Sequence, residues 1–140
     1  MASGPTPFPS QAESLVLLYD RLVNDTALLA LVPAAQITNH RVQDGVFPAC
    51  ILRVDGGVPF NTKDSNGYTQ RFVFDSWTAE HGDEPALAIN DAVVAALHDI
   101  PFAVASSGQS LLLQFESFQM VPTDGVSHHG ITFFTHIFTN

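Results

Sequence analysis

The segment that decides the fold is His128-His129-Gly130-Ile131-Thr132-Phe133-Phe134-Thr135-His136-Ile137-Phe138-Thr139. It is rich in β-branched and aromatic residues, as strands are. Because successive side chains of a strand point to opposite faces, Ile131 and Phe133 are predicted on one face, and Phe134 and Phe138 on the other. A sheet covered by helices on one side and by water on the other should alternate more cleanly. Both faces of this strand therefore need cover.

Residues 111–121 form a second strand with the same two-sided pattern. Alternation predicts Leu111, Leu113 and Phe115 on one face, and Leu112, Phe118 and Met120 on the other. Either both faces are covered within the subunit, or another subunit covers one of them. We favour the second explanation, because the helices predicted below suffice for about one face. The candidate interface residues are Phe118, Met120, Phe134 and Phe138.

Two main helices are predicted outside these strands. Residues 11–24 follow a capping box at Ser10 and Glu13 and carry apolar residues at helical spacing. The second helix begins after Asp83 and ends near His98 or Asp99. A short helix over about residues 26–32 lies between them.

Strands are predicted at residues 37–41, 47–54 and 68–77. The order of elements indicates an α+β fold. We expect a single domain over residues 10–140, preceded by a Pro-rich extended segment at residues 1–9. Its sheet is mostly antiparallel, with about four to five strands and two main helices packed on one face.

A long polar connection is predicted between the strands at 47–54 and 68–77. The connection holds about a dozen residues, and loops of that length are usually functional or mobile. We expect this one to contact a partner protein. Its candidate residues are Gly56, Gly57, Asn61, Lys63, Asp64 and Asn66.

Charge argues against nucleic-acid and membrane binding. Fourteen acidic residues face five basic ones, a formal charge of −9, and the arginines are scattered. A sequence-independent DNA binder needs clustered Lys and Arg, and a membrane-surface helix needs a basic face. No apolar run reaches the length of about 20 residues that a membrane span needs. Residues 1–9 lack the charge and apolar core of a signal peptide, so we expect synthesis in the cytoplasm.

The sequence predicts no catalytic residue, no metal site and no cofactor. Cys50 is the single cysteine and lies in an apolar run, which is typical of a buried thiol. His128 and His129 point to opposite faces of their strand, and His136 lies about 26 Å from His128 along it. The motifs of zinc proteases, calcium loops, nucleophile elbows and P-loops are absent from the sequence.

Four charged residues lie at strand positions: Arg53, Arg71, Asp75 and Glu116. Two interpretations remain open. They line a water-facing sheet face, or they line a surface that faces another subunit or a channel. On the second interpretation, Asp55, Asp75 and Glu116 are the candidate channel-facing acids.

The order of segments resembles the tail-completion or tail-terminator family of long-tailed bacteriophages and gene transfer agents. The resemblance covers nearly the whole chain. Its most telling parts are Phe47-Pro48-Ala49-Cys50-Ile51 and Arg71-Phe72-Val73-Phe74-Asp75-Ser76-Trp77. The opening helix, the run from Asp25 to Val32 and the helix from Pro85 to His98 complete it.

This resemblance implies a structural protein of the particle, without catalytic residues or cofactors. It implies a ring, usually of about six copies, at the head-proximal end of the tail tube. The expected partners are other copies of the chain, the tail tube protein and the head-proximal connector. DNA is expected to pass through without specific binding. The alternatives are a small α+β ligand-binding or enzyme domain that dimerises, and a tail-tube or baseplate component.

Overall fold

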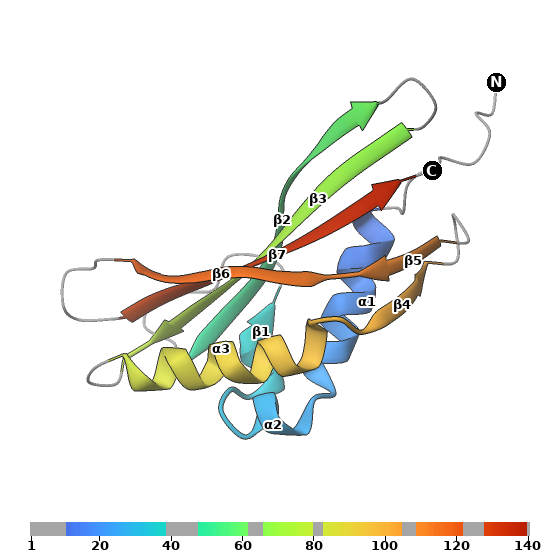
Figure 1. The fold of residues 1–140 in the computed structure, drawn as a ribbon. Coiled ribbons are helices and arrows are strands. Elements are labelled where there is room, and N and C mark those ends of the chain that lie inside the picture. Colours follow the sequence, from blue (N-terminus) through green and yellow to red (C-terminus); the bar gives the residue numbers. More distant parts are fainter. Residues whose placement is uncertain are drawn as a thin grey trace.

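The computed structural model describes residues 11–38, 48–61, 66–79, 83–104, 109–121 and 128–139. Two long helices, α1 (Gln11–Val23) and α3 (Glu84–Leu97), lie on one face of a sheet (Figure 1). The short helix α2 (Thr26–Leu29) follows α1, and the 3-10 turn η1 (Ala34–Gln36) follows α2. Both predicted main helices are confirmed.

Local chemistry explains where α2 and α3 begin. The Asp25 carboxylate accepts a hydrogen bond from the Leu28 N–H at 3.0 Å, which satisfies a free donor of the first turn of α2. In α3, Pro85 lies in the first turn, where a missing N–H is harmless. The capping box predicted for α1 includes Ser10, which lies outside the described residues.

The main sheet has five strands in the order β1-β2-β3-β7-β6. The strands are β1 (Ile37–Thr38), β2 (Ala49–Asn61), β3 (Asn66–Thr78), β6 (Gln114–Val121) and β7 (His128–Thr139). β1 runs parallel to β2, and the other pairs are antiparallel. The predicted α+β class, the mostly antiparallel sheet and the helices on one face are therefore confirmed.

The predicted strand over residues 111–121 is two strands in different sheets. β5 (Gln109–Leu112) pairs with β4 (Pro101–Val104) in a separate two-stranded sheet, whereas β6 joins the main sheet. The chain changes sheets at Leu113, which is fully buried. β4 was not predicted, because Pro101 reads as the end of a helix rather than the start of a strand.

The core lies between the helices and the inner face of the sheet. Leu18 and Leu22 of α1 and Ile89 and Val93 of α3 are buried against it. The sheet contributes Leu52, Phe72, Phe74 and Phe134, all with no exposed surface. α3 is also tied to β7, because the Thr132 hydroxyl donates to Asn90 Oδ1 at 2.9 Å. Burial of this apolar surface is the main source of stability.

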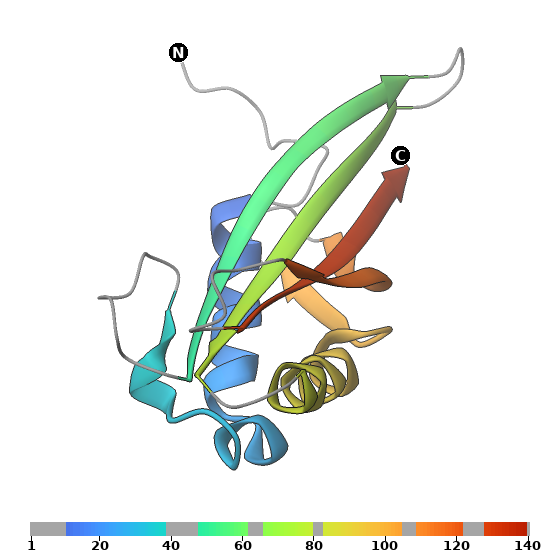
Figure 2. The same cartoon turned by 90° about the vertical axis from the view of Figure 1, so that its left-hand side faces the viewer.

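The β2–β3 hairpin extends beyond the helices (Figure 2). We call residues 55–61 of β2 and 66–70 of β3 the arm. Pairing continues along it to Asn61 opposite Asn66. β7 follows the arm as far as the pair of Gly67 with Thr139. The arm and the end of β7 together thus continue the sheet with three strands.

Candidate functional site

The helices leave one face of the main sheet uncovered among the described residues (Figures 1 and 2). We call it the outer face. The registers place Arg53 beside Val73, Asp75 beside Ile131 and Trp77 beside His129 on this face. Polar and charged side chains from β2, β3, β6 and β7 gather here.

One end of the outer face is organised around Asp75. The Arg53 Nε–H donates to Asp75 Oδ2 at 2.7 Å, and His129 Nε2 lies 2.8 Å from Asp75 Oδ1. The His129 ring stacks on Trp77 with centroids 3.7 Å apart. The carboxylate side chain is 8% exposed, so it is buried between its two partners.

The partners of Asp75 determine its protonation. Burial raises the pKa of this carboxyl, but the hydrogen bonds from His129 and Arg53 and the charge of Arg53 outweigh burial, so its pKa lies below the usual value. The hydrogen bond to Asp75 likewise raises the pKa of Arg53. Asp75 is therefore an ionised anchor at neutral pH rather than a proton donor.

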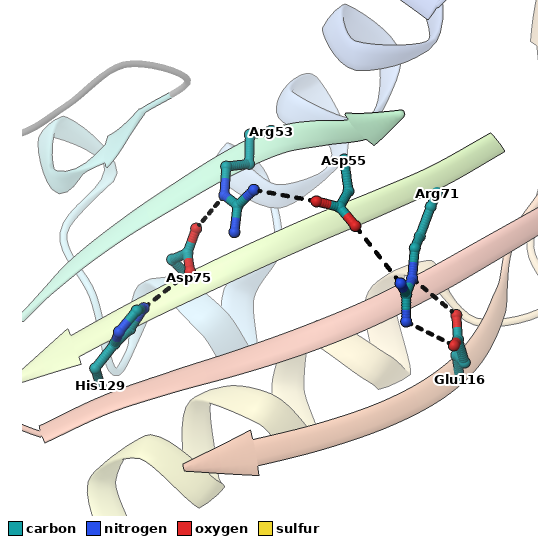
Figure 3. Close-up of polar contacts among 6 residues, drawn as sticks. All are labelled: Arg53, Asp55, Arg71, Asp75, Glu116 and His129. Carbon is teal, nitrogen blue, oxygen red and sulfur yellow. Dashed lines mark hydrogen bonds and ion pairs between the residues drawn. The ribbon is translucent and has the colours of Figure 1, made fainter. Parts of the chain in front are cut away.

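The other end is organised around Arg71. Its Nη2 lies 2.7 Å from Glu116 Oε1, and its Nη1 lies 3.6 Å from Asp55 Oδ2. Since Arg53 also reaches Asp55 at 3.5 Å, the contacts run without a break from His129 to Glu116 across the sheet (Figure 3). Asp55 and Glu116 are both extra residues of β-bulges, where the register shifts by one.

Apolar side chains lie beneath these charges. The guanidinium carbon of Arg71 lies 4.5 Å from the centre of the Phe133 ring, a cation–π contact. Val73, next to Phe133 in the register, has no exposed surface. At Phe133, part of the two-sided apolar pattern is therefore covered within the subunit by the Arg71 side chain rather than by a helix.

The three predicted channel-facing acids do lie on one face. However, Asp55, Asp75 and Glu116 are all paired with Arg53 or Arg71. Three acids and two arginines leave this cluster a formal charge of −1, with histidine neutral. Most of the chain's charge of −9 therefore lies elsewhere. Strand pairing therefore brings an arginine beside each of these acids, and the charges of the cluster largely compensate one another. That these acids face a channel stays a prediction.

The structure separates the four predicted interface residues. Phe134 is fully buried in the core under the helices, so the prediction that it faces a neighbour is wrong. Phe118 and Met120 are partly exposed on β6, at the edge of the sheet. The bulge at Glu116 brings Phe115, 37% exposed, onto the same face as these two. We call Phe115, Phe118 and Met120 the rim. The side chain of Phe138 lies outside the described residues.

The predicted partner-contact loop is mostly strand. Gly56, Gly57, Asn61 and Asn66 belong to the paired strands of the arm, which corrects the prediction of a dozen-residue connection. Sequence reasoning missed this because glycine, proline and asparagine are depleted in strands. Gly56 has φ of 131°, a backbone conformation that glycine adopts readily. Lys63 and Asp64 lie outside the described residues.

The described residues contain no group of three His, Cys, Asp or Glu side chains that would hold a metal ion. Cys50 is buried, and burial raises the pKa of its thiol, as expected for an unreactive core cysteine. Within the described part of the chain, no helix has the length and apolar character to cross a bilayer. Sequence reasoning did not predict that His129 stacks on Trp77 and contacts Asp75, because both contacts depend on the β3–β7 register.

A family model described as "Tail completion protein gp17" matches residues 16–137. The chain belongs to this family. It is a structural protein of phage-type tails, and its place is in the particle, as the resemblance implied. No curated protein gives a significant match.

Solved structures support the fold. A chain of "Virion of native gene transfer agent (GTA) particle" superimposes with a TM-score of 0.70 and 19% sequence identity. The match covers 94% of this chain and 100% of that chain. At this identity the likeness shows that the two share a fold.

Proposed function

We propose that this tail-completion protein acts without catalysis, as a ring of about six copies that caps the head-proximal end of the tail tube. Its partners are then neighbouring copies, the tail tube protein and the connector at the head. The observation that carries the proposal is the family match over residues 16–137.

The rim and the arm are the surfaces that we assign to neighbouring copies. In the rim, Phe118 and Met120 are partly exposed and lie on β6, an edge strand that has no further strand beyond it among the described residues. Unprotected edges and exposed apolar side chains favour association. The arm reaches beyond the body of its own subunit, as contact with a neighbour or with the tube requires (Figure 2). When neighbouring copies contact each other through two different surfaces, they form a ring if the rotation from one copy to the next closes after a full turn.

The outer face is our candidate for the channel lining. Its charges are paired with one another, and its formal charge is near neutral. Such a surface offers phosphates neither a cluster of cations nor a strong repulsive field. DNA then passes because nothing on the face binds it.

The mass of the purified protein in solution tests the proposed number of copies in the ring. We expect about 91 kDa by light scattering, which is six times the subunit mass of 15.1 kDa. Phe118→Asp should lower the mass with little loss of helix by circular dichroism. Val16→Asp is the control, because Val16 is an exposed apolar residue on α1, away from the rim.

Assembly of particles in cells tests the proposed role in joining heads to tails. Cells that lack this gene should produce heads and tails that do not join, and wild-type protein should restore joining whereas Phe118→Asp should not. A wild-type protein that stays monomeric at high concentration, together with normal joining in its absence, would contradict the proposal.

A further inference from the structure

The chain passes from β5 into β6 through residues 112–115, which we call the crossover. Two histidines from distant parts of the chain hold it. The Phe115 N–H donates to His98 Nδ1 at 2.9 Å, and the Leu112 N–H donates to His136 Nδ1 at 3.1 Å. Peptide N–H groups in strands usually donate to carbonyl oxygens, so imidazole acceptors here replace part of the ladder.

An imidazole nitrogen accepts a hydrogen bond only while it carries no proton. His98 Nδ1 accepts in this structure, so the ring is neutral with its proton on Nε2. Protonation places a second N–H at Nδ1, directly opposite the Phe115 N–H. Two donors then face each other, and the bond is lost.

The two histidines differ in how they respond to a proton. His136 Nδ1 also lies 2.9 Å from the Leu112 carbonyl oxygen, so a protonated Nδ1 can donate there and stay attached to the same residue. For the imidazole ring of His98, the described residues show only the acceptor contact with the Phe115 N–H. His98 is also exposed, whereas His136 is buried. His98 is therefore the responsive group.

Three charged groups lie on the segments that adjoin His98 and its partner Phe115. Asp99 follows it in the chain and accepts from the Gln114 amide at 3.0 Å. Arg21 of α1 donates to the Ala96 carbonyl oxygen at 3.2 Å, and Glu116 of β6 is held by Arg71. The two carboxylates are thus engaged with other partners in the neutral state.

We propose that His98 is a pH-sensitive latch that holds the start of β6 to the end of α3. While the His98 ring is neutral, the latch is closed. Once the ring carries a second proton, the Phe115 N–H is released and residues 114–116 loosen, while β6 beyond the bulge stays paired with β7. The latch is a property of the single folded subunit. Its effect on assembly would act through the rim residue Phe115, and that effect rests on the proposed function.

Hydrogen exchange tests the latch on the full chain. Peptides that cover residues 114–117 are compared at pH 7.5 and pH 5.0, after correction for intrinsic exchange rates. In the wild-type protein, the protection of these amide hydrogens against exchange should fall about fivefold at pH 5.0, which is the effect of losing one hydrogen bond. Protection in β3 around Phe74, in the core, should not change.

Three variants separate the latch from a structural role. His98→Asn keeps an acceptor oxygen near the position of Nδ1 and cannot titrate, so its protection should be independent of pH. His98→Ala should show low protection at both pH values. His128→Asn, which changes a histidine near Asp83 and outside the crossover, should respond like wild type.

Unchanged wild-type protection between the two pH values would overturn the proposal, as would a pH-dependent loss in His98→Asn. A measurement on the wild-type chain guards against variants that fold poorly. The ¹⁵N shifts of histidine-labelled protein should show Nδ1 of His98 unprotonated at pH 7.5, and a protonated Nδ1 would also refute the latch. Because none of these measurements depends on ring assembly, failure of the latch and failure of the proposed function are distinguishable.

Discussion

Removal of the Asp75 carboxylate should destabilise the subunit more than removal of any other acid on the outer face. Asp75→Ala leaves the imidazole of His129, whose side chain is 13% exposed, without its 2.8 Å partner. A buried polar group that loses its partner costs about 1–3 kcal/mol. The ion pair with Arg53 adds only about 0–1 kcal/mol, because that side chain is 44% exposed and water replaces the lost partner. We expect the free energy of unfolding to fall by about 1–4 kcal/mol in total.

Glu116→Ala is the matched control. It also removes a carboxylate paired with an arginine at 2.7 Å, but both side chains are 41% exposed. Its cost should be under about 1 kcal/mol. Urea unfolding at pH 7, followed by circular dichroism and by the fluorescence of Trp77, the single tryptophan, measures both variants. Equal losses for the two variants would refute the argument that burial of the His129–Asp75 contact sets the difference.

Three further predictions concern acid, the core and the edge of the sheet. The pKa of Asp75 is lowered in the folded state, so the ionised carboxylate stabilises the fold fully above about pH 4. This contribution is lost as pH falls through the folded pKa. The wild-type protein should therefore lose more free energy of unfolding between pH 7 and pH 3 than Asp75→Asn does. Phe134→Ala should cost about 3–5 kcal/mol in urea unfolding, whereas Phe118→Ala should cost clearly less. In Gly130→Ala, the added Cβ would lie 2.9 Å from the Phe118 ring and from Ser76 Oγ. The substitution should therefore lower the free energy of unfolding by about 1–3 kcal/mol and shift the Phe118 ring in a crystal structure. An unmoved ring would contradict this.

Hydrophobic spacing and capping chemistry predicted the helices and the class of the fold. The boundaries of α1 and α3 follow from apolar periodicity and from Pro85, which are local signals. β7 was predicted with its observed bounds, because twelve residues of β-branched and aromatic character leave little alternative.

The arm and the crossover were not predictable in the same way. Gly56, Gly57 and Pro59 are typical of loops, yet they lie in a strand, because pairing with β3 outweighs their weak local preference. The switch at Leu113 between two sheets leaves no mark in the alternation of apolar residues. The faces of β6 were misassigned for a related reason, since the bulge at Glu116 reverses the alternation after Phe115.

The candidate site was predicted in its residues but not in its chemistry. Arg53, Arg71, Asp75 and Glu116 were recognised as charged strand residues that share a surface. Their pairing depends on the register of four strands, and a one-residue shift would place each on the other face. The sequence alone therefore suggested an acidic lining where the structure shows compensated charges.

The two bulges have a consequence for how relatives of this chain should be compared. Each extra residue, Asp55 in β2 and Glu116 in β6, resets which of the following positions point inward. In a relative that lacks the counterpart of Asp55, the residues beyond the bulge keep the same partners in β3, so their alternation matches that of this chain only when the gap is placed at position 55. The counterpart of Arg71 in that relative would also lose one acidic neighbour, so the deletion and a change at that arginine should be inherited together. Alignments that place a gap elsewhere in the strand would compare residues from opposite faces of the sheet.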